Sequence, residues 1–489
     1  GEVGVCIATS GPGATNLVTG IATAYLDSVP IVAITGNVST SQLGKDSFQE
    51  VDIVGITLPI VKHSYIVRDI KDLESTIAEA FRIASSGRKG PVLIDIPKDI
   101  QNSYSEYLGL ALNKEKEVRE LKNNNDYSEA LKAIAKSKKP YIYAGGGCVT
   151  EDMGDDLIEL SQKLDAPIGT SLMGKTCIPA SYELDIGPMG MHGRAASNRA
   201  KDEADLVIGI GVRFSDRATG KLEEYINNKT FIHIDIDSAE MQKNIRNIIP
   251  LEGRAKDIVK DLNQLIGKHN NKEWIEKIKE EKAKDDEFIE NDDFNAKSII
   301  RTINNWANED TVIATDVGQH QMWVMQHYRF EKNRKFLTSG GLGTMGYGFG
   351  AAIGGCIANN RENTVLFTGD GSFGMNLNEF ATAVNQKLPI LIILLNNSSL
   401  GMVRQWQSRF YESRYSSTDL SVRKTDFVAL AKAFGADGKE IRTLKELKDK
   451  LKEGFPKDMP YLLNCMISKD DEVLPMVPAG HGLKDMIVG

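Results

Sequence analysis

Two short polar motifs, Gly369-Asp370-Gly371-Ser372 and Asn396-Asn397, are the residues of this chain best suited to chemistry. Each follows an apolar run, Val365 to Phe367 in the first case and Pro389 to Leu395 in the second. Residues 373–388 are typical of a turn followed by a helix, so the pattern predicts a strand, a helix and a second, fully buried strand. Oxygen donors that follow neighbouring parallel strands lie at the edge where an open α/β sheet binds ligands.

These donors suit a magnesium ion that is shared with phosphate. A carboxylate, an amide oxygen and a backbone carbonyl are hard ligands, and Mg²⁺ prefers to complete its shell with phosphate oxygens. The glycines of the first motif would let the backbone approach a diphosphate closely. An ordinary strand–helix–strand crossover is the alternative interpretation. We predict metal ligands at Asp370, Asn397 and Ser399, and diphosphate contacts at Gly369, Gly371 and Ser372.

The composition is that of a globular protein with room for several domains. The 489 residues allow about three domains of typical size, and 41% hydrophobic with 26% charged residues is ordinary. The net charge of −8 argues against a nucleic-acid partner. No apolar run reaches the roughly 20 residues that span a bilayer. The five cysteines and seven histidines are scattered, which indicates a reducing compartment and neither disulfides nor zinc sites.

Three α/β blocks, separated by two polar connectors, must position the motifs. The first block is expected to hold a strand ending at Ala8, a glycine-rich turn over 9–16, a helix through Tyr25, and strands over 31–35 and 91–96. The polar residues 104–125 are the first connector.

The second and third blocks show the same alternation of strands and helices. The second opens with a strand over 141–143 and a turn over 144–147, followed by strands over 206–211 and 231–236. Residues 268–295 form the second connector, part of it a helix with alternating charges on a solvated face. The third block begins near Ala296.

The chain begins with Gly1 rather than Met and enters directly into Val3 to Ala8, which is typical of a buried strand. Because a domain seldom begins inside its own sheet, we expect further residues to precede Gly1 in the natural protein.

Five motifs in one order resemble the catalytic large subunits of acetolactate synthase, also called acetohydroxyacid synthase. The resemblance runs from Val3 to about Met486, and the GDG…NN pattern is similar to the signature that binds thiamine diphosphate. The motifs are SGPGATN (10–16), GKDSFQE (44–50), GMHG (190–193), RFSDRATG (213–220), and GDGSFGMN followed by NNSSLGMVRQWQ (369–407).

The resemblance implies three doubly wound parallel-sheet α/β domains and three cofactors. It assigns residues 1–103 to the pyrimidine half of thiamine diphosphate, 126–267 to a central FAD-associated domain, 296–470 to the diphosphate and Mg²⁺, and 471–489 to a carboxyl-terminal arm. In this family a glutamate from the partner subunit activates the aminopyrimidine, and it would lie upstream of Gly1. We therefore expect the chain as given to be inactive alone.

The first block supplies three candidate residues near the reacting substrate. In the family the counterpart of Gln49 lies against cofactor and substrate, where an amide can donate to a developing oxyanion. Phe48 would be a pocket wall. Lys98 matches a lysine at the mouth of the substrate channel, where it could attract the carboxylate of a 2-keto acid. The alternatives are a turn residue for Gln49 and a solvated side chain for Lys98.

The third block supplies residues around the cofactor. The resemblance implies phosphate contacts at Gln319 and His320, which could instead be a helix-capping pair. It places Gly343 where the cofactor passes, and Met345 as the wedge that bends it, with a plain core methionine as the alternative.

Met402 and Trp406 are four residues apart and share a helix face. The family's tryptophan shapes the pocket for the second keto acid. The alternative interpretation is that Met402 and Trp406 form an apolar stripe on the helix that packs into the protein core.

The central block, together with Arg88 ahead of it, carries the residues whose family counterparts contact or border FAD. The flavin is thought to be structural there and not a redox participant. Three glycines alone are weak support, and aspartates at a strand end can simply cap it. The residues are Arg88, Gly145, Gly146, Gly147, Met191, His192, Arg213, Asp216, Arg217, Asp235 and Asp237.

The resemblance implies an acetolactate synthase of branched-chain amino-acid biosynthesis, which decarboxylates pyruvate and joins the two-carbon unit to pyruvate or 2-ketobutyrate. The alternatives are another thiamine carboligase or oxidase, and an inactive cofactor-binding fragment or regulatory paralogue. The implied partners are small 2-keto acids, a second copy in a homodimer or homotetramer, and a regulatory small subunit, with no nucleic acid and no membrane. The implied location is the cytoplasm, or an organelle in a plant or fungus.

Overall fold

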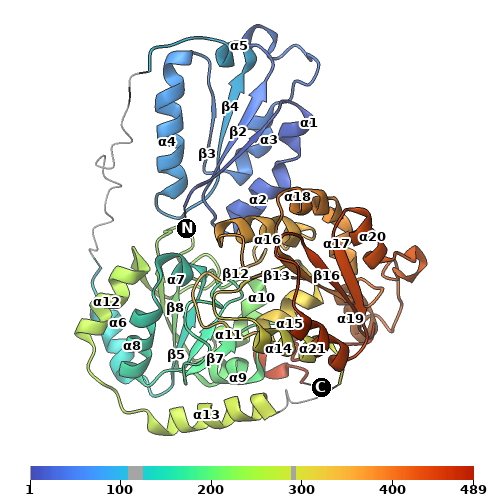
Figure 1. Ribbon diagram of the computed structural model, residues 1–489. Coiled ribbons are helices and arrows are strands. Elements are labelled where there is room, and N and C mark those ends of the chain that lie inside the picture. Colours follow the sequence, from blue (N-terminus) through green and yellow to red (C-terminus); the bar gives the residue numbers. More distant parts are fainter. Residues whose placement is uncertain (1, 108, 110–124, 288–292, 489) are drawn as a thin grey trace. The chain divides into compact units, whose positions relative to one another are not determined.

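The computed structural model describes residues 2–107, 109, 125–287 and 293–488, and it divides the chain into two compact units (Figure 1). The first unit comprises Gly1–Lys122 with Gly340–Thr344, and the second comprises Asn123–Ser339 with Met345–Gly489. The first unit contains one parallel sheet and the second contains two, which confirms the predicted α/β fold class.

The first unit is a four-stranded sheet with helices on both faces. Its strand order is β1-β2-β4-β3. The strands are β1 (Gly4–Ala8), β2 (Ile31–Asn37), β3 (His63–Ile66) and β4 (Val92–Pro97). The helices are α1 (Pro12–Thr15), α2 (Val18–Leu26), α3 (Ile53–Thr57), α4 (Leu73–Ser85) and α5 (Lys98–Gln101), with short 3₁₀ turns at Thr40–Gln42, Leu58–Ile60 and Ile70–Asp72.

Alternation along the strands explains the two layers of helices. Successive strand residues point to opposite faces, so Ala33 and Leu93 pack with α1 to α3, whereas Val32 and Val92 pack with α4. The first strand differs from expectation, because it is not buried. β1 is an edge strand with only β2 beside it, and the side chains of Val5 and Ile7 are 51% and 75% exposed.

The central block of the second unit is a six-stranded sheet with the order β10-β9-β8-β5-β6-β7. The strands are β5 (Pro140–Ala144), β6 (Ile168–Thr170), β7 (Asp185–Pro188), β8 (Leu206–Ile210), β9 (Thr230–Asp235) and β10 (Ile249–Glu252). The helices are α6 (Ser128–Lys136), α7 (Gly146–Glu151), α8 (Gly154–Leu164), α9 (Ala195–Glu203), α10 (Asp216–Thr219), α11 (Leu222–Ile226), α12 (Ala255–Leu265) and α13 (Lys272–Glu287).

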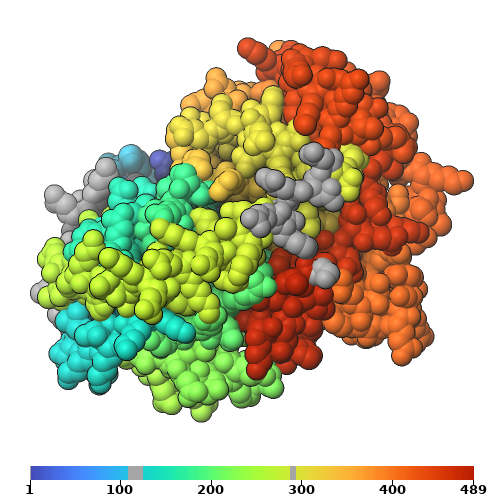
Figure 2. All heavy atoms as spheres, turned by 90° about the horizontal axis from the view of Figure 1, so that it is seen from below, coloured from blue at the N-terminus to red at the C-terminus, as the bar shows by residue number. Residues whose placement is uncertain are grey.

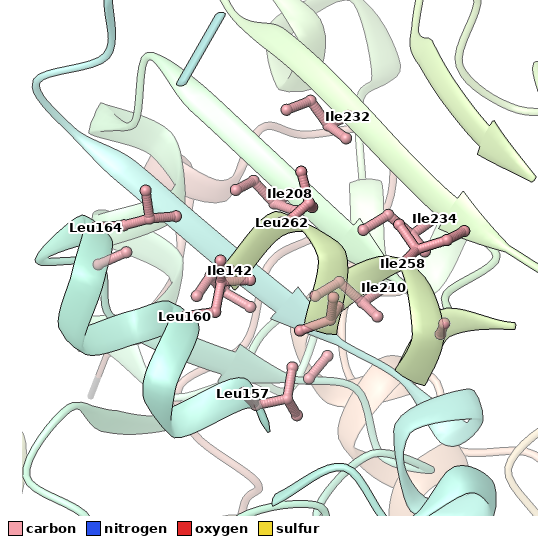
Figure 3. Packing of buried hydrophobic residues seen from close by; sticks show 14 of the residues in the cluster. Ile142, Leu157, Leu160, Leu164, Ile208, Ile210, Ile232, Ile234, Ile258 and Leu262 are labelled. Atoms are coloured by element: carbon pink, nitrogen blue, oxygen red, sulfur yellow. The ribbon is translucent and has the colours of Figure 1, made fainter. Parts of the chain in front are cut away.

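An isoleucine- and leucine-rich layer holds one face of this sheet. Figure 3 shows Ile142, Ile208 and Ile234 of three strands pointing toward Leu160 of α8 and Ile258 of α12. All five side chains are fully buried. Burial of each such side chain stabilises the fold by roughly 1.5–3 kcal/mol.

The predicted second connector is a docked helix and not merely a solvated one. The side chains of Trp274 and Ile278 on α13 are 4% and 2% exposed, and the indole N–H of Trp274 donates to the carbonyl oxygen of Pro140 at 3.0 Å. Figure 2 shows this yellow-green helix along the surface of the central block. The packing of α13 was difficult to predict from the sequence, because most of its residues are charged and only a narrow apolar stripe touches the core.

The third block is a six-stranded sheet with the order β12-β11-β13-β14-β16-β15. The strands are β11 (Val312–Thr315), β12 (Phe336–Leu337), β13 (Thr364–Gly369), β14 (Ile390–Asn396), β15 (Asp437–Ile441) and β16 (Tyr461–Met466). The helices are α14 (Ala296–Trp306), α15 (Gln319–His327), α16 (Tyr347–Ala358), α17 (Asp370–Asn376), α18 (Phe380–Asn385), α19 (Gly401–Phe410), α20 (Phe427–Ala433) and α21 (Leu444–Glu453), with 3₁₀ turns at Leu377–Glu379, Ser421–Arg423 and Leu483–Asp485. The predicted turn after the GDGS motif is wrong, because α17 begins at Asp370 itself.

The last residues of the chain, Asp471 to Val488, pass from one core of the second unit to the other. Val473 belongs to the core of the third block, while Val477 and Leu483 belong to the core of the central block. The Val477 N–H donates to the carbonyl oxygen of Met191 at 2.8 Å. We call this segment the C-terminal arm. No helix in the described ranges is long and apolar enough to cross a membrane.

Candidate cofactor site

The candidate site lies where the strand order of the third sheet changes direction. After β11 the chain adds β12 on one side and then β13 on the other, so the carboxyl ends of β11 and β13 border a crevice. Ligands of open α/β sheets bind at such points. Gln319 and His320 follow β11, Asp370 follows β13, and Asn397 follows β14.

Asp370 is a buried carboxylate with an unused oxygen. Its side chain is 5% exposed, and its Oδ1 has no hydrogen-bond partner among the described residues. Burial raises the pKa of Asp370 to about 6, although its backbone neighbours, including the N–H of Asn397, partly oppose the shift. A buried, unpaired carboxylate is costly, so this position favours a bound cation.

Asn397 lies beside Asp370 and is oriented by its own loop. Its Oδ1 accepts from the Ser399 N–H at 3.0 Å, and Ser398 between them adopts a left-handed φ of 53°. The Ser399 hydroxyl donates to the carbonyl oxygen of Thr418 at 3.0 Å. The structure therefore brings together the three predicted metal ligands on adjoining strand ends.

His320 lies against two glycines at the same edge. A Cβ on Gly318 or Gly369 would come within 2.9 or 3.0 Å of the imidazole ring, so no larger residue fits at either place. Burial lowers the pKa of His320 to about 3, and its Nε2 is buried without a described partner. A neutral imidazole held this way can offer one hydrogen bond to a ligand.

Gln319 is buried within a network of amides. Its Nε2 donates to Gln405 Oε1 at 3.0 Å and to the carbonyl oxygen of Asp471 at 2.9 Å, while its Oε1 faces Asn397 Nδ2 at 3.4 Å. Sequence reasoning missed Gln405, which is 3% exposed. A glutamine between Arg404 and Trp406 carries no local signal of burial.

Asp316 is a second residue that sequence reasoning passed over. Its Oδ1 accepts from the backbone N–H of Val317 and Gly346 at 2.9 and 2.8 Å. It thereby ties the end of β11 to the glycine-rich run. Met345 lies in this run and is half-buried, and its Cε lies 3.9 Å from where a Cβ on Gly371 would stand.

The remaining predicted cofactor contacts are Ser372 in the second unit and Gly343, which belongs to the first unit. The Ser372 hydroxyl donates to the carbonyl oxygen of Val317 at 2.7 Å, which joins α17 to the end of β11. Gly343 is exposed and has a left-handed φ of 71°, so only glycine is unstrained there.

Met402 and Trp406 lie on α19 in different surroundings. Met402 packs against the core of the third block, as the alternative interpretation expected. Trp406 is half-buried, meets Phe410 at 5.3 Å between ring centroids, and has the Arg217 guanidinium 6.0 Å from its ring.

Gly145, Gly146 and Gly147 begin α7 at the point where the central sheet changes direction, between β5 and β8. A Cβ on Gly145 would lie 2.0 Å from the carbonyl oxygen of Gly211, and one on Gly147 would lie 2.8 Å from its Cα. The close approach of the two backbone turns therefore explains why positions 145 and 147 are glycine, and no bound ligand is needed to account for them.

Met191 and His192 are buried beside the same central sheet. Burial lowers the pKa of His192 to about 4, and its Nε2 has no partner within the described part of the chain. The His192 carbonyl oxygen accepts from Gln326 Nε2 at 2.9 Å, and Arg217 Nη1 approaches Met191 Sδ at 3.0 Å.

The charged candidates of the central block lie at the ends of β8 and β9. Asp235 Oδ1 accepts from the Asp237 N–H at 3.0 Å, so the pair does form the capping turn of the alternative interpretation. The Arg213 carbonyl oxygen accepts from Asn244 at 2.7 Å. The side chains of Asp216 and Arg217 are 85% and 66% exposed and lie 3.7 Å apart.

In the first unit the two predicted loops meet. A Cβ on Gly11, in the glycine-rich turn, would lie 2.8 Å from the carbonyl oxygen of Gln49. Gln49 is exposed with a left-handed φ of 62°, a conformation that is uncommon for residues other than glycine. The side chain of Phe48 is 89% exposed.

The other first-unit candidates lie at the sheet's edges. Lys98 is exposed at the first position of α5. Arg88 is half-buried, and its Nε donates to the Ser28 hydroxyl at 2.9 Å. The carboxylate of Glu50 accepts from the backbone N–H of Ser47 at 2.9 Å and so holds its own loop.

Three thiamine pyrophosphate enzyme family models match the chain. The N-terminal TPP binding domain matches residues 1–56, the central domain matches 127–262, and the C-terminal TPP binding domain matches 316–465. The N- and C-terminal models describe thiamine pyrophosphate-binding domains, which supports thiamine diphosphate as the cofactor.

Curated relatives match over almost the whole chain. The chain is 41% identical to a probable acetolactate synthase large subunit of Methanocaldococcus jannaschii, over 100% of this chain and 85% of the relative. It is 40% identical to the acetolactate synthase large subunit of Haemophilus influenzae, over 100% and 87%. It is 42% identical to the acetolactate synthase large subunit of Cyanidium caldarium, over 99% of this chain and 85% of the relative. The chain therefore belongs to the acetolactate synthase large subunit family of thiamine diphosphate-dependent enzymes.

Proposed function

We propose that this protein is the catalytic subunit of an acetolactate synthase. It removes the carboxyl group of pyruvate as carbon dioxide and bonds the remaining two-carbon unit to the carbonyl carbon of a second 2-keto acid, either pyruvate or 2-ketobutyrate. The buried, unpaired Oδ1 of Asp370 beside Asn397 is the observation that carries this proposal.

Mg²⁺ fits the donors at this edge of the sheet. The Asp370 carboxylate, the Asn397 amide oxygen and the Ser399 backbone supply oxygens only, which is the set that Mg²⁺ prefers when phosphate completes its shell. No group of three or more His, Cys, Asp or Glu side chains gathers elsewhere in the described ranges as an alternative metal site.

A diphosphate fits the polar groups around the cation. His320 offers a buried ring nitrogen, and Gly369 and Gly371 pack closely against the side chains of His320 and Leu400 at the same edge. The N-terminal ends of α15 and α19 adjoin there, because a Cβ on Gly401 would lie 1.9 Å from Gln319 Oε1. Helix N-termini favour anions.

When bound, thiamine diphosphate supplies an acidic ring carbon and an electron sink for the unit left by decarboxylation. We assign Met345 to its support, Gln49 to hydrogen bonding of the developing oxyanion, and Lys98 to attraction of the substrate carboxylate. Trp406, with Met402 behind it, bounds the side chain of the second keto acid.

FAD fits the central block. The switch point between β5 and β8 is where an open sheet accepts a dinucleotide. His192, which follows β7, has a buried Nε2 without a described partner. Gly146, Met191, Arg213 and Asp235 would border the flavin, and we infer a structural role for it.

A second copy of the chain and a small subunit are the proposed protein partners. Phe48, Ile7 and Leu58 expose 89%, 75% and 67% of their side chains in the first unit, and burial of such apolar side chains against another chain would be favourable. The relatives are named large subunits.

The test is a product assay on the full-length natural protein, with pyruvate alone and then with added 2-ketobutyrate, in the presence of thiamine diphosphate, Mg²⁺ and FAD. We expect acetolactate, and then 2-aceto-2-hydroxybutyrate. Asp370→Ala should retain no thiamine diphosphate. Acetyl phosphate formed from pyruvate when phosphate and oxygen are supplied, or tartronate semialdehyde formed when glyoxylate replaces pyruvate, would instead indicate another thiamine enzyme.

A further inference from the structure

The side-chain amide of Gln405 is saturated with hydrogen bonds inside the protein. Its Oε1 accepts from the Val473 N–H at 2.9 Å and from Gln319 Nε2 at 3.0 Å. Its Nε2 donates to the Val473 carbonyl oxygen at 3.0 Å and approaches Met476 Sδ at 3.5 Å. An amide has two acceptor and two donor positions, so every one of them is used. One side chain thus joins the C-terminal arm to Gln319.

Gln319 can adopt only one orientation as a consequence. Both hydrogens of its Nε2 are engaged, one by Gln405 Oε1 and one by the carbonyl oxygen of Asp471. Its Oε1 must then point the other way, toward Asn397 Nδ2 at 3.4 Å. If the amide turned over, two acceptors would face each other at Gln405, and burial of a polar group without a partner is unfavourable.

The oriented oxygen in turn sets the amide of Asn397. Because Asn397 Nδ2 faces Gln319, its Oδ1 is directed to the other side, where it also accepts from the Ser399 N–H. Gly401 makes the approach possible, since a Cβ there would lie 1.9 Å from Gln319 Oε1 and 2.7 Å from Asn397 Nδ2. Three amides therefore form a chain from the arm to a proposed metal ligand.

We propose that Gln405 is a positioning residue for the site of thiamine diphosphate and Mg²⁺, acting through Gln319 on Asn397. The inference rests on the proposed function of Asp370 and Asn397 as metal ligands. Gln405 touches neither of them, so its effect is on the direction in which the amide oxygen of Asn397 is held.

The simpler interpretation is that Gln405 only fastens the C-terminal arm. That role predicts lower stability without a specific change in cofactor binding. The positioning role predicts weaker binding of thiamine diphosphate even after the loss of stability is taken into account. Affinity, rather than activity, therefore separates the two.

The experiment compares thiamine diphosphate binding by calorimetry at saturating Mg²⁺ for the full chain and for Gln405→Met, which keeps the length of the side chain and removes the amide. Loss of a group that orients a metal ligand commonly weakens binding 10- to 100-fold, and we expect a loss in that range. The matched control is Asn263→Leu, which removes a buried amide bonded to the Asp156 carbonyl oxygen in the central block. It should lose stability and keep its affinity within about two-fold.

A double-mutant cycle tests the route through Gln319. If Gln405 acts on Asn397 only through Gln319, the double variant Gln405→Met/Gln319→Met should bind no more weakly than Gln319→Met alone. Additive losses would overturn that route. An unchanged affinity in Gln405→Met would overturn the whole inference.

Two further outcomes keep the test decisive. Should Gln405→Met fail to fold, Gln405→Glu retains the oxygen that accepts from Gln319, and we expect tighter binding from it than from Gln319→Met. Equal weakness of the two would count against positioning. If the full-length natural protein binds thiamine diphosphate and makes no acetolactate, the proposed function is refuted and this inference stands. Absence of any binding would refute both.

Discussion

Lys201 on α9 is a long cationic side chain buried completely in the central block. Its Nζ donates to the Tyr225 carbonyl oxygen at 2.5 Å and lies 3.0 Å from the centroid of the Tyr225 ring. Burial, and secondarily the charge of Lys229, lowers the pKa of Lys201 to about 6. At neutral pH the amine is therefore mostly neutral in the folded protein and charged in the unfolded chain.

This difference makes the contribution of Lys201 to stability depend on pH. Folding must release a proton between about pH 6 and 10.5, so the cost is full below pH 6 and disappears as the pH rises toward 10.5. We expect Lys201→Met to raise the free energy of unfolding by up to about 5 kcal/mol at pH 7, since each pH unit below 10.5 adds about 1.4 kcal/mol to the cost. The gain should shrink in denaturant titrations at pH 9–10. A gain that is the same at both pH values would show that Lys201 is charged when folded.

Trp406 offers a flat apolar wall, and one buried methylene is worth about 0.8 kcal/mol. We expect Trp406→Leu to lower the preference for 2-ketobutyrate over pyruvate several-fold and to leave turnover of pyruvate alone largely intact. The ratio of the two products in a mixed-substrate assay measures this. An unchanged ratio would place Trp406 in the core rather than in the acceptor pocket.

The sequence predicts some of these residues and hides others for a physical reason. Asp370 and Asn397 stand directly after apolar strands, so their common edge follows from strand geometry alone. Gln405 and Lys201 are polar residues on helices, where exposure is the usual outcome. Gln405 is buried against Val473 and Lys201 against Tyr225. Both partners are distant in sequence, so the residues around Gln405 and Lys201 give no sign that these side chains are buried.

At the scale of elements, the start of α19 determines how closely the amides of the site can meet. Gly401 is its first residue, and an added methyl group would overlap the Gln319 oxygen. We expect Gly401→Ala to weaken thiamine diphosphate binding more than ten-fold while lowering the unfolding temperature only modestly. Calorimetric titration and a thermal melt of the same sample measure the two effects.

A second helical glycine provides the control. Gly354 lies inside α16, is exposed, and has no atom within 4 Å of the place where its Cβ would stand. Gly354→Ala should therefore stabilise the chain by about 0.5–1 kcal/mol through lower backbone entropy, and leave affinity unchanged. If both variants weaken binding alike, steric overlap at Gly401 is not the cause.

The elements themselves could be predicted in proportion to their apolar content. The apolar runs at 365–367 and 389–395 predicted β13 and β14, because central parallel strands are apolar on both faces. β6 and β12 have three and two residues and carry no such signal. The edge position of β1 was not foreseen, because a run of apolar residues does not say how many neighbours a strand has.

At the scale of the whole chain, the C-terminal arm is part of two cores in the second unit. Leu483 is 3% exposed in the core of the central block. We expect Leu483→Ala to cost about 2–4 kcal/mol and to lower the denaturant midpoint. Leu265→Ala, at a position that is 54% exposed, is the control and should change stability by less than about 0.5 kcal/mol. Equal effects would mean that the arm contributes little.

The position of the C-terminal arm also determines when the central block can finish folding during translation. The sheet of the central block is complete once β10 has left the ribosome, yet Val477 and Leu483 are translated more than two hundred residues later. At 5–20 residues per second, an apolar surface beside Tyr225 and Phe231 stays uncovered for on the order of ten to forty seconds. The nascent chain therefore passes through a long interval in which chaperones, or aggregation with neighbouring chains, compete for a surface that only its last residues can close.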